Sequence, residues 1–105
     1  MKLFPLKHVI VFTWGWGEAS TLSEVDQRLA QRGFYTVRPK ANILVATSRT
    51  KPAIVIFTFI QAGREGGDLI LIQTPAGPYT YDQIMRFIHL FAKLAGIRIL
   101  HATGR

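Results

Sequence analysis

The chain has 105 residues, of which 49% are hydrophobic and 18% are charged, so composition predicts a single globular domain over residues 1–105 and excludes a disordered segment. It contains no cysteine, which excludes a disulfide framework, a thiolate metal site and a cysteine nucleophile. Thirteen Lys and Arg against six acidic residues give a formal net charge of +7. This charge predicts an anionic partner: nucleic acid, an acidic membrane surface or an acidic protein. The alternative is a charge that serves only solubility.

The first elements follow from runs of apolar residues. Val9–Trp14 is β-branched and aromatic, which predicts a strand that ends at the Gly15–Gly17 turn. Thr21 and Glu24 have the spacing of a helix capping box, and apolar residues at helical spacing follow as far as Gly33. Four more strands are predicted after it, and the short turns between them favour antiparallel pairing: residues 34–37, 42–47, 53–60 and 68–74.

The C-terminal part predicts a second helix. A capping-box pattern at 80–83 precedes an apolar stripe at helical spacing, so the helix is expected over Tyr81–Ala95, with Gly96 ending it. Residues 97–102 are left open as a possible last strand. The order β-α-β-β-β-β-α, with or without a final β, predicts an α+β fold. Two helices would pack on one face of an antiparallel sheet of five to six strands.

Targeting segments are not expected. The N-terminal apolar run Val9–Trp14 is shorter than the ~7–15 residues of a signal-peptide core. Nothing in the sequence approaches the ~18 apolar residues that a membrane span requires. We therefore expect a cytoplasmic protein with no membrane partner.

The strands do not alternate apolar with polar residues, as a sheet with one solvent-exposed face normally does. The set richer in aromatic residues is expected under the helices, because aromatic side chains bury the most area. The other set is then predicted on the open face: Val11, Thr13, Val45, Thr47, Ile56, Thr58, Leu71 and Gln73. A face this apolar needs a cover. The candidates are a second copy of the chain, a nucleic-acid groove, a ligand or the chain's own C-terminal segment, and a homodimer is favoured.

The order of elements from Val9 to Gly96 resembles one repeat of the TATA-box-binding protein family: a strand, a helix, four strands and a long helix. The resemblance implies a curved antiparallel sheet whose apolar, threonine-bearing face lies in the DNA minor groove. It also implies that a homodimer would supply the family's second repeat. The family's Ser-Gly-Lys turn is absent, and Gln61–Gly67 occupies its place. No base-contacting residue is therefore carried over.

Basic residues group in the predicted loops beside the sheet, where they would suit the phosphates on either side of a groove. Trp16, between two glycines, could stack on a base or fold back onto the core. The predicted nucleic-acid contacts, to DNA or RNA, are Arg38, Lys40, Arg49, Lys51, Arg64 and Trp16. The alternative is that the basic residues are simply solvated.

Catalytic patterns are lacking. The three histidines have no metal-ligand spacing, and the six acidic residues are scattered. Asp82 and Arg86 have the spacing of a helical ion pair. We expect no catalytic residue, no metal and no cofactor, and hence a non-enzymatic nucleic-acid-binding protein that acts as a homodimer. The alternatives are an interaction module that buries the apolar sheet face against a protein partner, and a small dimeric α+β enzyme or ligand binder.

Overall fold

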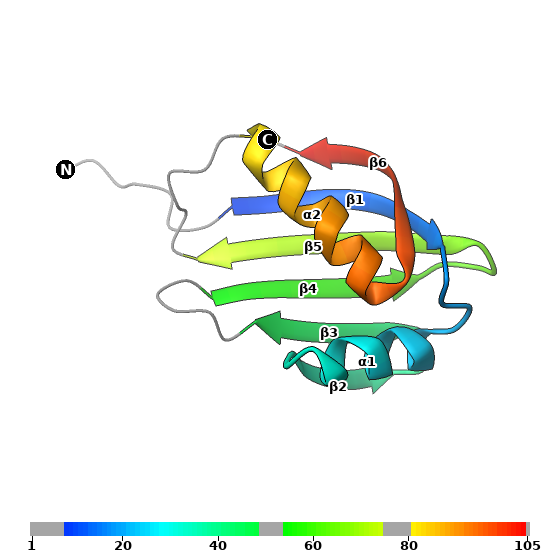
Figure 1. The fold of residues 1–105 in the computed structure, drawn as a ribbon. Coiled ribbons are helices and arrows are strands. Elements are labelled where there is room, and N and C mark those ends of the chain that lie inside the picture. Colours follow the sequence, from blue (N-terminus) through cyan, green and yellow to red (C-terminus); the bar gives the residue numbers. More distant parts are fainter. Residues whose placement is uncertain (1–7, 49–53, 75–80, 105) are drawn as a thin grey trace.

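The computed structural model describes residues 8–48, 54–74 and 81–104. These residues form an antiparallel sheet covered on one side by two helices, which confirms the predicted α+β fold (Figure 1). The elements in chain order are β1 (His8–Trp16), α1 (Leu22–Gln31), β2 (Tyr35–Lys40), β3 (Ile43–Ser48), β4 (Ile54–Gln61), β5 (Gly66–Thr74), α2 (Tyr81–Ala95) and β6 (Ile97–Gly104).

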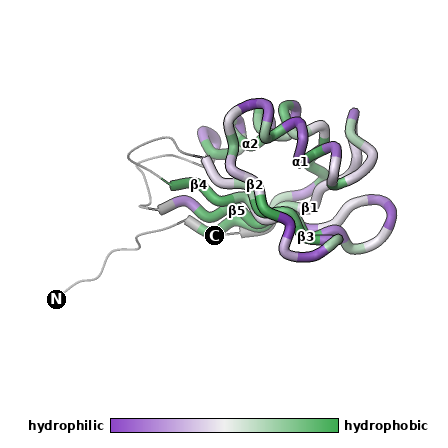
Figure 2. Tube along the Cα trace, turned by 90° about the horizontal axis from the view of Figure 1, so that it is seen from below, coloured by the Kyte–Doolittle hydropathy of each residue, from purple (hydrophilic) through white to green (hydrophobic). Residues whose placement is uncertain are grey.

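The sheet has the strand order β2-β3-β4-β5-β1-β6. The final strand therefore extends the sheet by pairing with β1, and it does not fold across the open face. A bulge between Thr13 and Trp14 interrupts the β1–β6 register. Both helices lie on the same side of the sheet (Figure 2). Within the described residues, no helix is long and apolar enough to cross a membrane. The cytoplasmic location stays a prediction.

Helix α1 begins at the predicted cap. The Thr21 side chain accepts a hydrogen bond from the Glu24 backbone N–H at 3.1 Å. The Glu24 carboxylate reaches back one residue further than expected, to the N–H of Ser20 at 2.6 Å and to its hydroxyl at 3.1 Å. These bonds, the Ser20 N–H foremost, hold the pKa of Glu24 below its ordinary value. Gly33 follows the helix with a positive φ, which only glycine adopts readily.

Helix α2 is fastened to α1 by an arginine. Arg28 donates from Nε to the Leu94 carbonyl at 3.1 Å, and from Nη2 to the Glu18 carboxylate at 2.9 Å. The last turn of α2 therefore gains a donor for a carbonyl that has no partner within the helix. The predicted Asp82–Arg86 pair does not form, since Arg28–Glu18 is the one ion pair in the part of the chain that the structure describes.

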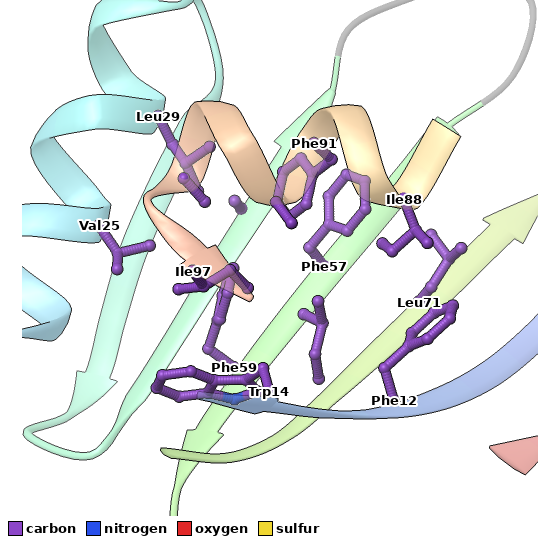
Figure 3. Close-up of a cluster of buried hydrophobic side chains, with 14 of the residues drawn as sticks. Phe12, Trp14, Val25, Leu29, Phe57, Phe59, Leu71, Ile88, Phe91 and Ile97 are labelled. Atoms are coloured by element: carbon purple, nitrogen blue, oxygen red, sulfur yellow. The ribbon is translucent and has the colours of Figure 1, made fainter. Parts of the chain in front are cut away.

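The core lies between the helices and the sheet, and its largest side chains are aromatic (Figure 3). Phe57 of β4 stacks on Phe91 of α2 with ring centroids 3.7 Å apart. Trp14 is fully buried and meets Phe59 edge to face at 5.8 Å. Burial of each such side chain contributes about 2–3 kcal/mol. The aromatic residues thus mark the helix-covered face in β1 and β4, as predicted.

Strand β5 has the opposite orientation to the prediction. Leu71 pairs with the buried Phe57 across the sheet and is 1% exposed, and Figure 3 shows it among the core side chains. Gln73 is likewise buried on the helix side. Leu71 and Gln73 therefore do not belong to the open face, where Ile70 and Ile72 stand instead. Strand β5 contains no aromatic residue, so the feature that fixed the other strands was missing from it.

Candidate functional site: a basic sheet end and an open face

Arg38 is occupied within the fold. Its guanidinium donates to the Ala41 carbonyl at 2.7 Å and to the Ser23 hydroxyl of α1 at 3.2 Å. These bonds draw it toward the helix side of β2, and the residue is half-buried. Arg38 therefore ties the β2–β3 hairpin to α1 and is not presented to a nucleic acid on the open face.

Trp16 also folds back onto the molecule. Its ring packs edge to face on Trp14 with centroids 4.8 Å apart, and its indole N–H donates to the Arg64 carbonyl at 2.6 Å. Both contacts would be lost if the ring swung out to stack on a base. Of the two alternatives for Trp16, the structure supports packing against the core.

Lys40 and Arg64 are exposed, as a phosphate contact requires. Arg49 and Lys51 lie outside the described residues. Arg98, at the start of β6, is not among the residues predicted from the sequence. It donates from Nε to the Trp16 carbonyl at 3.0 Å and remains exposed. We call Lys40, Arg64 and Arg98 the basic end, because the hairpins β2–β3 and β4–β5 and the start of β6 meet at one end of the sheet (Figure 1).

Hydrogen bonds hold the basic end together. Asn42 and Gln61 join the two hairpins, with the Gln61 N–H donating to the Asn42 carbonyl at 2.8 Å. The Trp16 indole N–H donates to the Arg64 carbonyl, and the Trp16 carbonyl accepts from Arg98. These two bonds link the β4–β5 hairpin to β6. Three cations that lie far apart in the sequence are thus brought to one end of the sheet. Only the pairing of β1 with both β5 and β6 brings Arg98 there, and no local pattern in the sequence indicates that pairing.

The open face is the side of the sheet without helices (Figure 2). Cross-strand partners point to the same side of an antiparallel sheet, so the pairing identifies its members. Six of the eight predicted residues lie there, namely Val11, Thr13, Val45, Thr47, Ile56 and Thr58. The same pairing adds Val9, Tyr35, Val37, Ile43, Ile54, Ile60, Asp68, Ile70, Ile72 and His101.

Charge is sparse on the open face. Asp68 and His101 flank Thr13 in one row across β5, β1 and β6, and Lys40 stands beside Ile43 at the β2 edge. Arg98 of β6 pairs with Gly15 and stands on the same side. The rest of the described face is aliphatic apart from threonines and the exposed Tyr35. Leu100, at the bulge, lies against Gly15 and is 55% exposed. The composition is that of a core surface that nothing in the described residues covers.

Metal-binding geometry is not found in the described part of the chain: no three His, Cys, Asp or Glu side chains lie close enough together to hold an ion. His89 stands exposed on α2, and Asp68 is separated from His101 by the whole of β1. The groups present can bind by charge and by apolar contact.

Comparison with known proteins adds no relative. No protein-family model, curated protein or solved structure matches the chain. The resemblance to the TATA-box-binding protein family therefore stays a prediction.

Proposed function

We propose that the protein is a small, non-enzymatic nucleic-acid-binding protein and that the basic end makes phosphate contacts. The observation that carries the proposal is the unneutralised charge: a net +7, with a single ion pair among the described residues. Phosphate contacts draw on free Lys and Arg side chains, and each contact releases counterions from the nucleic acid.

The spacing of the basic end fits a nucleic-acid strand. Lys40 stands on one edge strand and Arg98 on the other, with five inter-strand gaps between them. At ~4.8 Å per gap the end is roughly 24 Å wide. Successive phosphates of one DNA strand advance ~3.4 Å along the helix axis, so this width corresponds to about seven nucleotides of duplex.

The test is fluorescence anisotropy with labelled single- and double-stranded DNA and RNA at several salt concentrations. The variant Lys40→Gln/Arg64→Gln removes two charges from the basic end. Neither side chain forms a hydrogen bond with another described residue, so the fold should be unaffected. We expect weaker binding to duplex DNA and a salt slope smaller by about 1.8, which is 0.9 for each lost contact.

The matched control is Arg32→Gln/Arg86→Gln, which removes the same charge from exposed positions in the helix layer. It should bind more tightly than the basic-end variant and keep the wild-type slope. Equal losses in both variants would mean that binding follows net charge and not the basic end. Absence of binding to every nucleic acid at low salt would overturn the proposed function.

A second candidate function is an interaction module that buries the open sheet face against another polypeptide. The specific observation in its favour is the aliphatic composition of that face, with Ile56, Ile70 and Val11 at its centre. Association through this face should survive high salt, because apolar burial is not screened. That response is opposite to the one expected for phosphate contacts.

A further inference from the structure

We infer that the open face binds the open face of a second copy of the chain, so that two sheets pack face to face about a two-fold axis. The inference concerns the apolar rows of this face, beside which Lys40 and Arg98 of the basic end stand at the two edges, and it does not depend on the proposed nucleic-acid binding. Three observations carry it: the composition of the face, its size and the location of the molecule's charge.

The composition is continuous across the sheet. One row runs Tyr35, Thr47, Ile56, Ile72, Val9, and the next runs Val37, Val45, Thr58, Ile70, Val11. Neither row contains a charged side chain. On the surface of an ordinary monomer, apolar residues are scattered singly or form small patches. An apolar patch that is continuous across five adjacent strands is larger than that. It resembles a domain core cut in half, as obligate dimer interfaces do.

The size of the face suits a dimer. Its six strands contain six to nine residues each. With ~4.8 Å between strands and ~3.3 Å per residue, the face covers roughly 700 Å². A stable interface buries about 800 Å² per partner. One copy of the face therefore supplies nearly the whole of one side of such an interface, with no second patch required.

Most of the described charged side chains lie away from the surface through which two copies would meet. Arg32, Arg86 and Lys93 are exposed in the helix layer, on the far side of the sheet. On the open face itself, the described charged or titratable side chains are Tyr35, Lys40, Asp68, Arg98 and His101. Lys40 stands at one edge of the sheet, and Arg98 and His101 stand at the other. Two chains of like charge can thus approach through these faces with little repulsion. A nucleic acid would find few cations there.

Self-complementarity follows from the regularity of the face. β-Branched side chains on adjacent strands form parallel ridges, and two such sheets interdigitate when packed ~10 Å apart with their strands ~30° from alignment. A two-fold axis pairs the patch with itself and closes the assembly at two copies. Thr47 and Thr58 fit this packing, because threonine is β-branched like valine and carries a methyl group.

The experiment is sedimentation velocity over a concentration series on the full chain. Wild type should sediment as a dimer, and the dimer should persist at high salt. Ile70→Lys puts a cation at the centre of the face and should raise the dimer dissociation constant at least about 100-fold, because two like charges are then brought together without water. The matched control, Leu90→Lys, makes the same change at an apolar α2 residue that is 64% exposed, and it should leave the dimer intact.

A mixing experiment distinguishes loss of the interface from loss of folding. Ile70→Lys and Ile70→Glu should each be monomeric alone, and should form a mixed dimer when combined, because opposite charges then meet near the axis. Circular dichroism checks that both are folded. Failure of folded variants to pair on mixing would overturn the inference, as would a dimer that Ile70→Lys leaves unchanged.

Other occupants give distinct results. A wild-type chain that is monomeric at all concentrations overturns the dimer. If its nucleic-acid binding is then abolished by Ile70→Glu, the face takes nucleic acid. If a monomeric wild type binds nucleic acid equally well with and without Ile70→Glu, the inference fails while the proposed function stands. A dimer that binds no nucleic acid supports the inference and overturns the proposed function.

Discussion

Arg28 joins three parts of the molecule through one guanidinium group. It comes from the last turn of α1, binds the carbonyls of Leu94 and Lys93 at the end of α2, and pairs with Glu18 in the β1–α1 connection. The Glu18 carboxylate is 82% exposed, so this ion pair is screened and contributes little. The bond to the Leu94 carbonyl is partly buried and matters more.

Replacing Arg28 should therefore destabilise the fold. Arg28→Met keeps the apolar stem and removes the donors, and we expect a loss of about 1–2 kcal/mol, toward the lower end for hydrogen bonds made by a charged group. Urea denaturation of wild type and variant measures it. Arg32→Met, at an exposed arginine of the same region, should change the free energy of unfolding by less than about 0.5 kcal/mol. Equal effects at the two positions would refute the role given to Arg28.

Single residues were the hardest to assign from the sequence. Arg38 and Trp16 were predicted to face a nucleic acid because each stands in or near a loop. Arg38 is instead held by Ser23, 15 positions away, and Trp16 by Arg64, 48 positions away. No local pattern reveals partners at such separations. Whether an arginine is free or engaged thus depends on the tertiary structure and not on its neighbours in sequence.

At the scale of elements, the start of α1 could be predicted from a local sequence pattern. The capping box at Thr21 and Glu24 was recognised from spacing alone, and the helix begins there. Helix starts and stops are set by neighbouring backbone groups, so they can be predicted locally. The bounds of α2 also agree with the expectation, and Gly96 follows its last residue. The predicted cap at Thr80 lies outside the described residues.

The Glu24 contacts give a pH dependence. The folded-state pKa lies below the ordinary value of 4.5. A lowered carboxyl pKa stabilises the fold above the unfolded-state pKa, and that contribution is lost as the pH falls through the folded-state pKa. The stability difference between wild type and Glu24→Gln should therefore be largest at neutral pH and shrink below about pH 4.5.

NMR titration of the Glu24 side chain tests the cause directly. Ser20→Ala removes the hydroxyl donor but keeps the backbone N–H, which is the main cause of the shift. The pKa in that variant should rise only part of the way toward its ordinary value. A midpoint at 4.5 or above in wild type would be incompatible with the hydrogen bonds described at the start of α1.

Strand faces were predictable only where a strong marker existed. In β1 and β4, Phe12, Trp14, Phe57 and Phe59 identify the covered side. In β5, both alternating sets are aliphatic, so periodicity alone leaves the two orientations equivalent. A shift by one residue exchanges the faces. Pairing with β4 decides between them, and it sets Leu71 opposite Phe57.

For the whole molecule, the unbalanced charge should make stability depend on salt. With a net charge of +7 and one ion pair in the ranges 8–48, 54–74 and 81–104, the folded state is subject to self-repulsion that counterions screen. We expect the melting temperature to rise between low and moderate NaCl concentration, measured by differential scanning calorimetry at constant protein concentration. Lys40→Gln/Arg64→Gln should show a smaller rise. A melting temperature that falls with added NaCl would contradict this account.

The position of β1 between β5 and β6 has a consequence for folding during synthesis. Val9 pairs with Ile72, and Phe12 pairs with both Leu69 and Ala102. Strand β1 is therefore synthesised before either of its partner strands, β5 and β6. As the chain emerges from the ribosome, β1 has two unpaired edges and apolar side chains on both faces until β5 is synthesised. One edge stays open until β6 follows. During that interval the nascent chain exposes the kind of segment that chaperones bind and that aggregates readily. The sheet can close only after nearly all of its residues have been translated, which makes its formation a late step with high contact order.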